Sequence, residues 1–154
     1  MLKITQPAPL FTLRNDAGSP ISLADFRGKQ HVVLYFYPKD DTPGCTLEAN
    51  QFTALADAFA KADTVVIGIS MDSCDSHRQF IDKYGLRVLL LSDSDGQVVR
   101  DYGVWQEKEK AGIKKMGIVR STFIIDKSGT LVDVSYGVNP EGHAQQVLEK
   151  IRKL

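Results

Sequence analysis

The chain has 154 residues, of which 43% are hydrophobic and 25% are charged. This length suits a single domain over residues 1–154 that buries roughly 70% of its unfolded surface without help from disulfides or metal ions. Nineteen basic and nineteen acidic residues cancel, so no overall field would gather nucleic acid or an anionic membrane around the protein. A small or neutral substrate is therefore favoured.

The N-terminal residues and the number of cysteines indicate where in the cell the protein is expected. Residues 1–7 lack a basic region followed by an apolar core, so no export signal is predicted. The longest early apolar run, residues 32–37, is too short to span a bilayer. Two cysteines are too few for the disulfide scaffold of a small secreted protein. The sequence favours a reducing cytoplasm, with no membrane association.

Runs of β-branched and aromatic residues predict strands over residues 32–37, 64–69, 88–91, 122–125 and 131–136. Helical spacing of apolar residues separates the first three of these strands. The first such pattern comprises Leu47, Phe52, Leu55 and Phe59, and the second comprises Phe80, Ile81 and Tyr84. Strands that alternate with helices in this way predict parallel βαβ units.

The later part of the chain predicts a different connection. Residues 126–129, Asp-Lys-Ser-Gly, form a tight-turn sequence that suits an antiparallel hairpin. A final helix is expected to begin with Asn139 as its N-cap and Pro140 at its first position. Residues 11–13 and 21–23 are expected to form a small accessory hairpin. Together these patterns predict an α/β fold with a central mixed β-sheet flanked by helices.

Residues 35–48, with the sequence YFYPKDDTPGCTLE, carry the strongest chemical signal. A buried strand enters a turn, and a helix is predicted to follow with Thr42 as its N-cap and Pro43 at its first position. Cys45 would then lie in the first helical turn, where unpaired backbone N–H groups favour a thiolate. This place is also beyond the carboxyl end of a strand, where ligand crevices form. The alternative is a small buried helix cysteine with no chemical role.

The pattern Pro38-x-x-x-Thr42-x-x-Cys45 resembles the active-site signature of the peroxiredoxins, and the longer string resembles their bacterioferritin-comigratory, or Q-type, branch. The resemblance extends to residues 26–29, 68–73 and 120–126. It implies a thioredoxin-like fold and a thiol-dependent peroxidase that reduces hydrogen peroxide and organic hydroperoxides through a cysteine sulfenic acid. It also implies regeneration by thioredoxin or another thiol reductant, and no cofactor.

The same resemblance assigns roles to individual residues. Cys45 becomes the peroxidatic nucleophile, and Thr42 supplies a hydroxyl that orients the peroxide. Pro38 or Pro43 shields the thiolate. Arg120 matches the arginine that the family places beside the thiolate from a distant strand, where its permanent charge would favour the ionised sulfur.

The other polar residues near the signature are expected to be structural. Glu48 would lie in the early turns of the helix, where a carboxylate interacts well with the helix dipole. A peroxidase with an already ionised thiolate requires no general base. Packing or surface roles are therefore expected for His31, His77 and His143.

Cys74 is the other cysteine, and its role stays open at this point. Many Q-type relatives keep a resolving cysteine five residues after the nucleophile, where this chain has Asn50. Another subset carries it on the next helix, at a position that aligns with Ile81, about two helical turns after Cys74. Cys74 is the candidate resolving cysteine, and the alternative is a one-cysteine cycle completed by an external thiol. The branch resemblance also favours a monomer.

Three other functions compete with the peroxidase. A metal site could combine Cys45 with Cys74 and His77, although structural zinc sites usually show four ligands in paired short spacings. A disulfide reductase would normally have Cys-x-x-Cys, but Thr42 stands where the first cysteine would be. A redox-inert thioredoxin-like binding module could use residues 108–115, although mixed charge in a loop usually indicates a solvated face.

Overall fold

The computed structural model describes all residues, 1–154. The strands are β1 (Thr12–Asn15), β2 (Pro20–Ser22), β3 (His31–Phe36), β4 (Thr64–Ser70), β5 (Leu89–Ser92), β6 (Trp105–Lys110), β7 (Ile113–Ile118), β8 (Ser121–Ile125) and β9 (Leu131–Tyr136). The helices are α1 (Pro43–Ala54), α2 (Ala56–Lys61), α3 (Cys74–Tyr84), α4 (Gln97–Asp101) and α5 (His143–Arg152), with a 3₁₀ helix at Leu23–Phe26.

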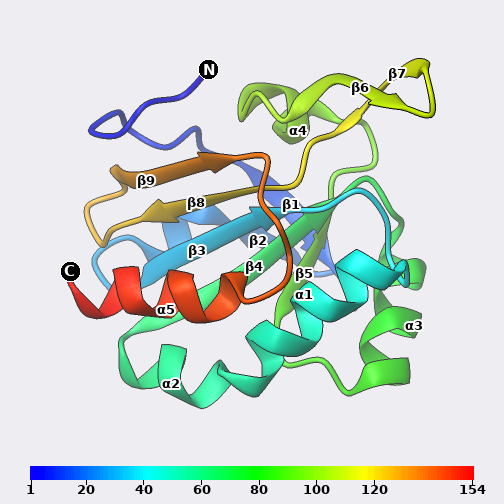
Figure 1. Cartoon of the computed structure of the whole chain (residues 1–154). Coiled ribbons are helices and arrows are strands. Elements are labelled where there is room, and N and C mark those ends of the chain that lie inside the picture. Colours follow the sequence, from blue (N-terminus) through cyan, green and yellow to red (C-terminus); the bar gives the residue numbers. More distant parts are fainter.

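Seven strands form one mixed sheet in the order β2-β1-β5-β4-β3-β8-β9 (Figure 1). Strands β3, β4 and β5 are parallel, and β8 runs antiparallel to β3. The helices α1 and α3 follow β3 and β4 as crossover connections, as the predicted βαβ units require. The carboxyl ends of β3 and β4 therefore meet at the same edge of the sheet.

The two faces of the sheet bury separate apolar clusters. Along β3, Val32, Leu34 and Phe36 join one cluster while Val33 and Tyr35 join the other, because successive side chains of a strand point to opposite faces. Helices α1, α2, α3 and α5 cover the face of Val33 and Tyr35. The N-terminal segment and α4 cover the opposite face (Figure 1).

All five predicted strands are confirmed, as β3, β4, β5, β8 and β9, with ends that differ by at most one residue. The turn at residues 126–129 joins β8 to β9 as an antiparallel hairpin, as predicted. The early hairpin also forms, since β1 pairs with β2. It is not an accessory element, however, because β1 also pairs with β5 and so extends the central sheet.

Two helix predictions are wrong in detail. The last helix begins at His143 with Gly142 as its N-cap, and Gly142 has a positive φ of 73°. The Asn139 side chain instead accepts a hydrogen bond from the backbone N–H of Glu141, which makes a turn before the helix. The helix predicted through Phe59 breaks at Leu55 into α1 and α2, and Leu47 is 39% exposed instead of facing the core.

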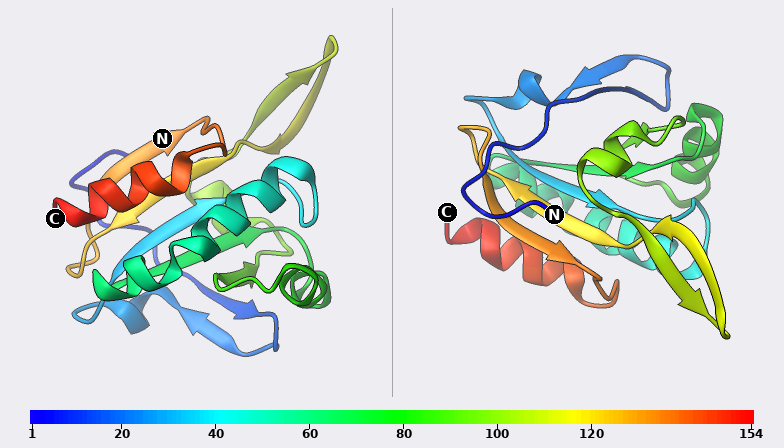
Figure 2. Two further views of the ribbon diagram at one scale, coloured as in Figure 1. Left: turned by 60° about the horizontal axis from the view of Figure 1, so that its bottom comes forward. Right: turned by 90° about the horizontal axis from the view of Figure 1, so that it is seen from above.

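The segment expected to be a mixed-charge loop is a hairpin formed by β6 and β7. Its residues pair from Trp105 opposite Ile118 to Lys110 opposite Ile113. The hairpin extends away from the rest of the chain, as both views of Figure 2 show. Because it is exposed on both faces for most of its length, its sequence carries no apolar alternation that would identify strands. No helix anywhere in the chain has the length and apolar character needed to cross a membrane.

Candidate active site

Cys45 occupies the position that the sequence predicts. Helix α1 starts at Pro43 with Thr42 in the N-cap position, where the backbone is extended. Cys45 is therefore the third helical residue, among backbone N–H groups that have no partner within the helix. Its side chain is only 2% exposed. A negative charge on its sulfur would gain from the positive end of the helix.

Arg120 lies against the sulfur of Cys45. Its Nη2 donates a hydrogen bond to Cys45 Sγ at 3.3 Å, and its Nη1 donates to Glu48 Oε1 at 2.7 Å. The sheet brings these distant residues together, because Ser121 at the start of β8 pairs with Phe36 at the end of β3. Burial alone would lower the pKa of Arg120, but the negative charges of Glu48 and Cys45 raise it. The guanidinium is a fixed positive charge beside the thiol.

Glu48 is fully buried, and its contact with Arg120 was not foreseen from the sequence. Burial raises its pKa from 4.5 to about 7, although the charge of Arg120 and the hydrogen bond from it act in the opposite direction. The short ion pair thus offsets only part of the desolvation cost, and Glu48 Oε2 has no hydrogen-bond partner within the protein. The three-residue spacing from Cys45 to Glu48 was a usable signal, because such residues share a helix face.

Gly44 allows the guanidinium to approach the helix. A Cβ atom built there would lie 3.1 Å from Arg120 Nη2 and 3.6 Å from Pro140 Cγ. Any larger residue would therefore require Arg120 to shift by a few tenths of an ångström. The close approach of Arg120 thus gives a steric reason for glycine at position 44, which the sequence alone does not reveal.

Thr42 and Pro38 lie in the segment that joins β3 to α1, before Cys45. The Thr42 hydroxyl donates to the backbone carbonyl of Lys39 at 2.9 Å and makes no capping bond to the helix. Pro38 is half-buried and lines a groove of about 680 Å³ with Met71, Trp105 and the β6–β7 hairpin. Most of the surface that lines this groove is apolar.

Comparison with known proteins identifies this arrangement. The profile of the AhpC/TSA family matches residues 4–134. The chain belongs to the AhpC/TSA family of peroxiredoxins. A Helicobacter pylori protein described as a peroxiredoxin bcp is 48% identical over 150 residues, covering 97% of this chain and 98% of its own. Peroxiredoxin Bcp of Bacillus subtilis is 41% identical over 153 residues, covering 99% of this chain and 97% of its own.

A solved structure gives the same result. The bacterioferritin comigratory protein of Xanthomonas campestris, described for its alkyl peroxide reduction activity, superposes with a TM-score of 0.88 at 38% identity, covering 93% of this chain and 90% of its own. The predicted thioredoxin-like α/β fold is confirmed. This peroxiredoxin is a thiol-dependent peroxidase that acts on hydroperoxides, and a redox-inert binding module is not favoured.

Cys74 lies in a different environment from Cys45. It is the first residue of α3 and is half-buried, in a hollow that it shares with Thr12 and Arg14 of β1 and Ser92 of β5. Both cysteines are free thiols. Strands β4 and β5 lie between β3, which leads to Cys45, and β1, which borders Cys74. A direct bond between the two sulfurs would therefore need movement of the backbone.

The structure does not assemble the metal site considered from Cys45, Cys74 and His77. Both ring nitrogens of His77 are hydrogen-bonded, one to Asp40 and one to the carbonyl of Leu91. Cys45 instead contacts Arg120. The chain thus leaves neither His77 nor Cys45 free for a cation shared with Cys74.

His143 is the first residue of α5, and it is buried with its ring against Phe52 of α1. Its Nε2 lies 2.8 Å from the Thr122 hydroxyl. Burial, together with the positive charge of Lys150, lowers its pKa to about 4. The ring is therefore neutral near pH 7, which fits the expected packing role.

The raised pKa of Glu48 predicts how stability depends on pH. Between pH 4.5 and about 7 the folded chain binds this proton and the unfolded chain releases it, so the free energy of unfolding falls as the pH rises through that window. Glutamine has nearly the same shape and no proton to exchange. We expect the free energy of unfolding of the wild type, minus that of Glu48→Gln, to fall by about 3 kcal/mol across the window. Urea unfolding at a series of pH values measures this difference, and a difference independent of pH would contradict the prediction.

Proposed function

We propose that Cys45 is the nucleophile of the peroxidase, and the observation that carries this proposal is the Arg120 Nη2 contact with Cys45 Sγ at 3.3 Å. The thiolate attacks one oxygen of the hydroperoxide. A sulfur–oxygen bond forms as the oxygen–oxygen bond breaks, and the other oxygen leaves as an alkoxide or hydroxide that takes up a proton. The sulfur is oxidised to a sulfenic acid, and the peroxide is reduced to an alcohol or water.

Arg120 and Thr42 are proposed to act on the peroxide as well as on the thiol. The planar guanidinium can address the sulfur and a peroxide oxygen together, and it stabilises negative charge that grows on the departing oxygen. The hydrogen of the Thr42 hydroxyl is committed to the Lys39 carbonyl. The Thr42 oxygen is then left to accept a hydrogen bond from the O–H group of the hydroperoxide, which would fix the orientation of the substrate.

Pro38 is proposed to shield the thiolate from bulk water, which fits its half-buried position in the lining of the apolar groove. Hydrogen peroxide and organic hydroperoxides are the proposed substrates. The apolar lining of the groove, together with the alkyl peroxide activity described for the Xanthomonas campestris relative, supports the inclusion of organic hydroperoxides.

Thioredoxin is the proposed thiol reductant, and the chain is proposed to act as a monomer of one domain in the cytoplasm. The Q-type resemblance supports the monomer and the reductant, and the two free thiols suit a reducing compartment. Peroxide consumption by the purified chain with thioredoxin, thioredoxin reductase and NADPH tests the activity. The absence of turnover with both thioredoxin and dithiothreitol would refute the proposal. Analytical ultracentrifugation tests the monomer.

Cys74 is proposed to resolve the sulfenic acid of Cys45 through a disulfide. It is the only other thiol, and a sulfenic acid left alone is liable to irreversible overoxidation. A disulfide needs the two Cα atoms within roughly 7 Å, so the first turns of α1 and α3 must loosen after oxidation. The half-buried side chain of Cys74 at the very start of α3 suits such a movement.

We expect one equivalent of peroxide to give wild-type protein that is lighter by two hydrogens, the mass of a Cys45–Cys74 disulfide. The Cys74→Ser variant should instead gain oxygen, because its sulfenic acid has no partner within the chain. Intact mass spectrometry distinguishes these products. If the wild type forms no disulfide and the variant turns over equally with thioredoxin, Cys74 is structural and the cycle uses one cysteine.

A further inference from the structure

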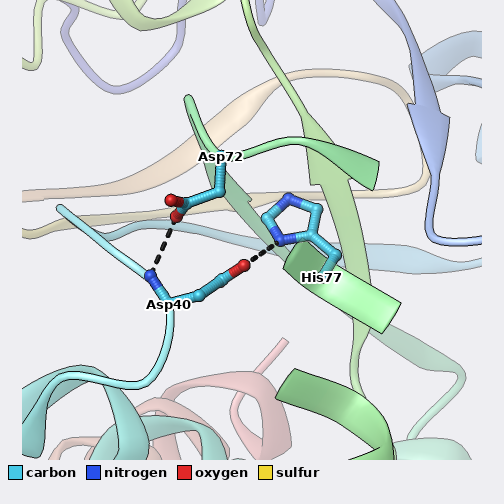
Figure 3. A group of neighbouring side chains, drawn as sticks. All are labelled: Asp40, Asp72 and His77. Atoms are coloured by element: carbon cyan, nitrogen blue, oxygen red, sulfur yellow. Dashed lines mark hydrogen bonds and ion pairs between the residues drawn. The ribbon is translucent and has the colours of Figure 1, made fainter. Parts of the chain in front are cut away.

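A buried polar cluster joins the segment before Cys45 to helix α3 (Figure 3). His77 of α3 is fully buried, and its Nδ1 lies 2.7 Å from Asp40 Oδ2. Its Nε2 lies 2.9 Å from the backbone carbonyl of Leu91 in β5. The backbone N–H of Asp40 donates to Asp72 Oδ2 at 2.8 Å. None of these groups takes part in the mechanism proposed above.

The contacts of His77 determine its protonation. A neutral imidazole has one N–H donor and one nitrogen lone pair, but both ring nitrogens of His77 face oxygens that can only accept. Only the doubly protonated imidazolium satisfies both. Burial lowers the pKa of His77, but the hydrogen bond and charge of Asp40, the Leu91 carbonyl and the charge of Asp72 together raise it above 6.5.

Asp40 forms a buried ion pair with His77, and its carboxylate accepts further hydrogen bonds. Besides His77, its carboxylate accepts hydrogen bonds from the hydroxyls of Tyr37 and Ser76. A buried charge pair is held in one geometry when additional hydrogen bonds satisfy its remaining lone pairs. Tyr37 follows β3 directly, and Ser76 lies in the first turns of α3, so this carboxylate connects the two elements.

The next residue, Asp41, is hydrogen-bonded to side chains at the C-terminal end of α3. Asp41 has a positive φ of 58°, which is unfavourable for a residue with a side chain. Its carboxylate accepts hydrogen bonds from Lys83 Nζ at 2.8 Å and from the Tyr84 hydroxyl. Two successive aspartates thus tie the segment between β3 and α1 to α3, immediately before Thr42 and the helix that carries Cys45.

The same cluster does not suit a metal ion. Ligand atoms of Asp40, Asp72 and His77 lie within 4.8 Å of one another. However, both ring nitrogens already face acceptors, and Asp72 Oδ2 accepts from the Asp40 backbone and from the Ser70 hydroxyl. A cation would have to displace these hydrogen bonds.

We propose that His77 is a positioning residue of this peroxidase: as a doubly protonated imidazolium it holds Asp40, and through Asp40 it fixes the segment between β3 and α1 so that Cys45 enters α1 facing Arg120. The inference rests on the proposed role of Cys45. Its physical basis is that small displacements of reacting groups are costly for rate.

The protonation of His77 is tested on the wild-type protein, without any substitution. Long-range ¹H–¹⁵N NMR spectra of the histidine rings distinguish an imidazolium from either neutral tautomer. We expect both ring nitrogens of His77 to be protonated near pH 7, while His143 is neutral. A neutral His77 ring would overturn the proposal. This measurement does not depend on activity, so it stands even if Cys45 is not the nucleophile.

The effect on chemistry is tested with His77→Gln, Asp40→Asn and the double variant, with His31→Gln as a matched control at the opposite end of β3. The readout is the rate constant for oxidation of Cys45 by hydrogen peroxide, followed by rapid quenching, alkylation and intact mass. We expect each single variant to be slower by about tenfold and His31→Gln to be unchanged. The double variant should be no slower than the slower single variant, because the two residues act through one contact.

A purely structural pair would give a different pattern. His77→Gln would then lower the midpoint of thermal unfolding, but at a temperature where it is fully folded it would react with peroxide as fast as the wild type. That result would overturn the proposal, and so would losses of rate that multiply in the double variant. If Cys45 of the wild type is not oxidised at all, the proposed function fails instead, and the NMR result still decides the state of His77.

Discussion

The Cys45→Ser variant is expected to lose peroxide reduction by about a thousandfold or more while keeping its fold. The serine hydroxyl is nearly the size of a thiol, so the tight packing around this buried side chain changes little. It ionises far less readily and is a much weaker nucleophile, so neither the end of α1 nor Arg120 has an anion to stabilise. The rate of peroxide consumption with dithiothreitol measures the loss, and circular dichroism verifies the fold.

The matched control is Cys74→Ser, which makes the same chemical change at the other cysteine. It should retain the first step, oxidation of Cys45, at the wild-type rate, because Cys74 lies in a separate hollow beside β1. Near-native turnover by Cys45→Ser would refute the assignment of the nucleophile. Equal loss in both variants would mean that the two thiols share the first step.

Replacing Arg120 by alanine is expected to slow the reaction with hydrogen peroxide by about a hundredfold, the usual effect of removing one donor from a developing negative charge. The variant loses the N–H that points at Cys45 Sγ and the positive charge that favours the ionised sulfur. Its thiolate fraction at a given pH, followed by ultraviolet absorbance, should fall together with the rate. Arg120→Lys should show an intermediate rate, since it keeps the charge but loses the planar pair of donors.

The stability of the Arg120→Ala protein needs its own control, because this variant leaves the buried carboxyl of Glu48 without a partner. The double variant Arg120→Ala/Glu48→Gln removes that carboxyl and should recover stability without recovering the rate. Unchanged thiolate absorbance and unchanged peroxide kinetics in Arg120→Ala would leave this arginine with a structural role only, as the partner of Glu48.

The sequence predicts the buried parts of this fold well. Strands β3, β4 and β8 are apolar on both faces because both faces of the sheet are covered, so their runs stand out from the rest of the chain. The β6–β7 hairpin was missed for the opposite reason. Most of its side chains face solvent on both sides of the hairpin, so its sequence need not alternate between apolar and polar residues.

Helix ends were predicted less well than strands. Thr42 and Pro43 mark the start of α1 as expected, because the extended N-cap and the fixed φ of proline are local properties. The start of α5 depends instead on Gly142, whose left-handed conformation and backbone contact with Gln51 of α1 come from the tertiary structure. An asparagine before a proline fits both a turn and a helix N-cap, so the sequence at Asn139 does not distinguish between them.

The candidate site also combines features that local sequence determines with features that depend on tertiary contacts. The position of Cys45 in the first turn of α1 follows from local sequence, whereas the partner of Arg120 depends on the pairing of β3 with β8. The burial of Glu48 and the contact of His77 with Asp40 could not be predicted from the sequence, for a different reason. Both are contacts between ionisable groups in the interior, where the surrounding packing determines which partner each group meets.

The single tryptophan of the chain gives the protein an optical reporter of its own. Trp105 starts the β6–β7 hairpin, lines the groove together with Pro38, and lies beneath the Arg100 guanidinium, whose carbon is 5.6 Å from the ring centroid. Indole emission responds to local polarity and to nearby charge. Any shift of the hairpin or of the Pro38 segment during the redox cycle would therefore change the intrinsic fluorescence, so that reduced and oxidised protein could be told apart in real time without a dye.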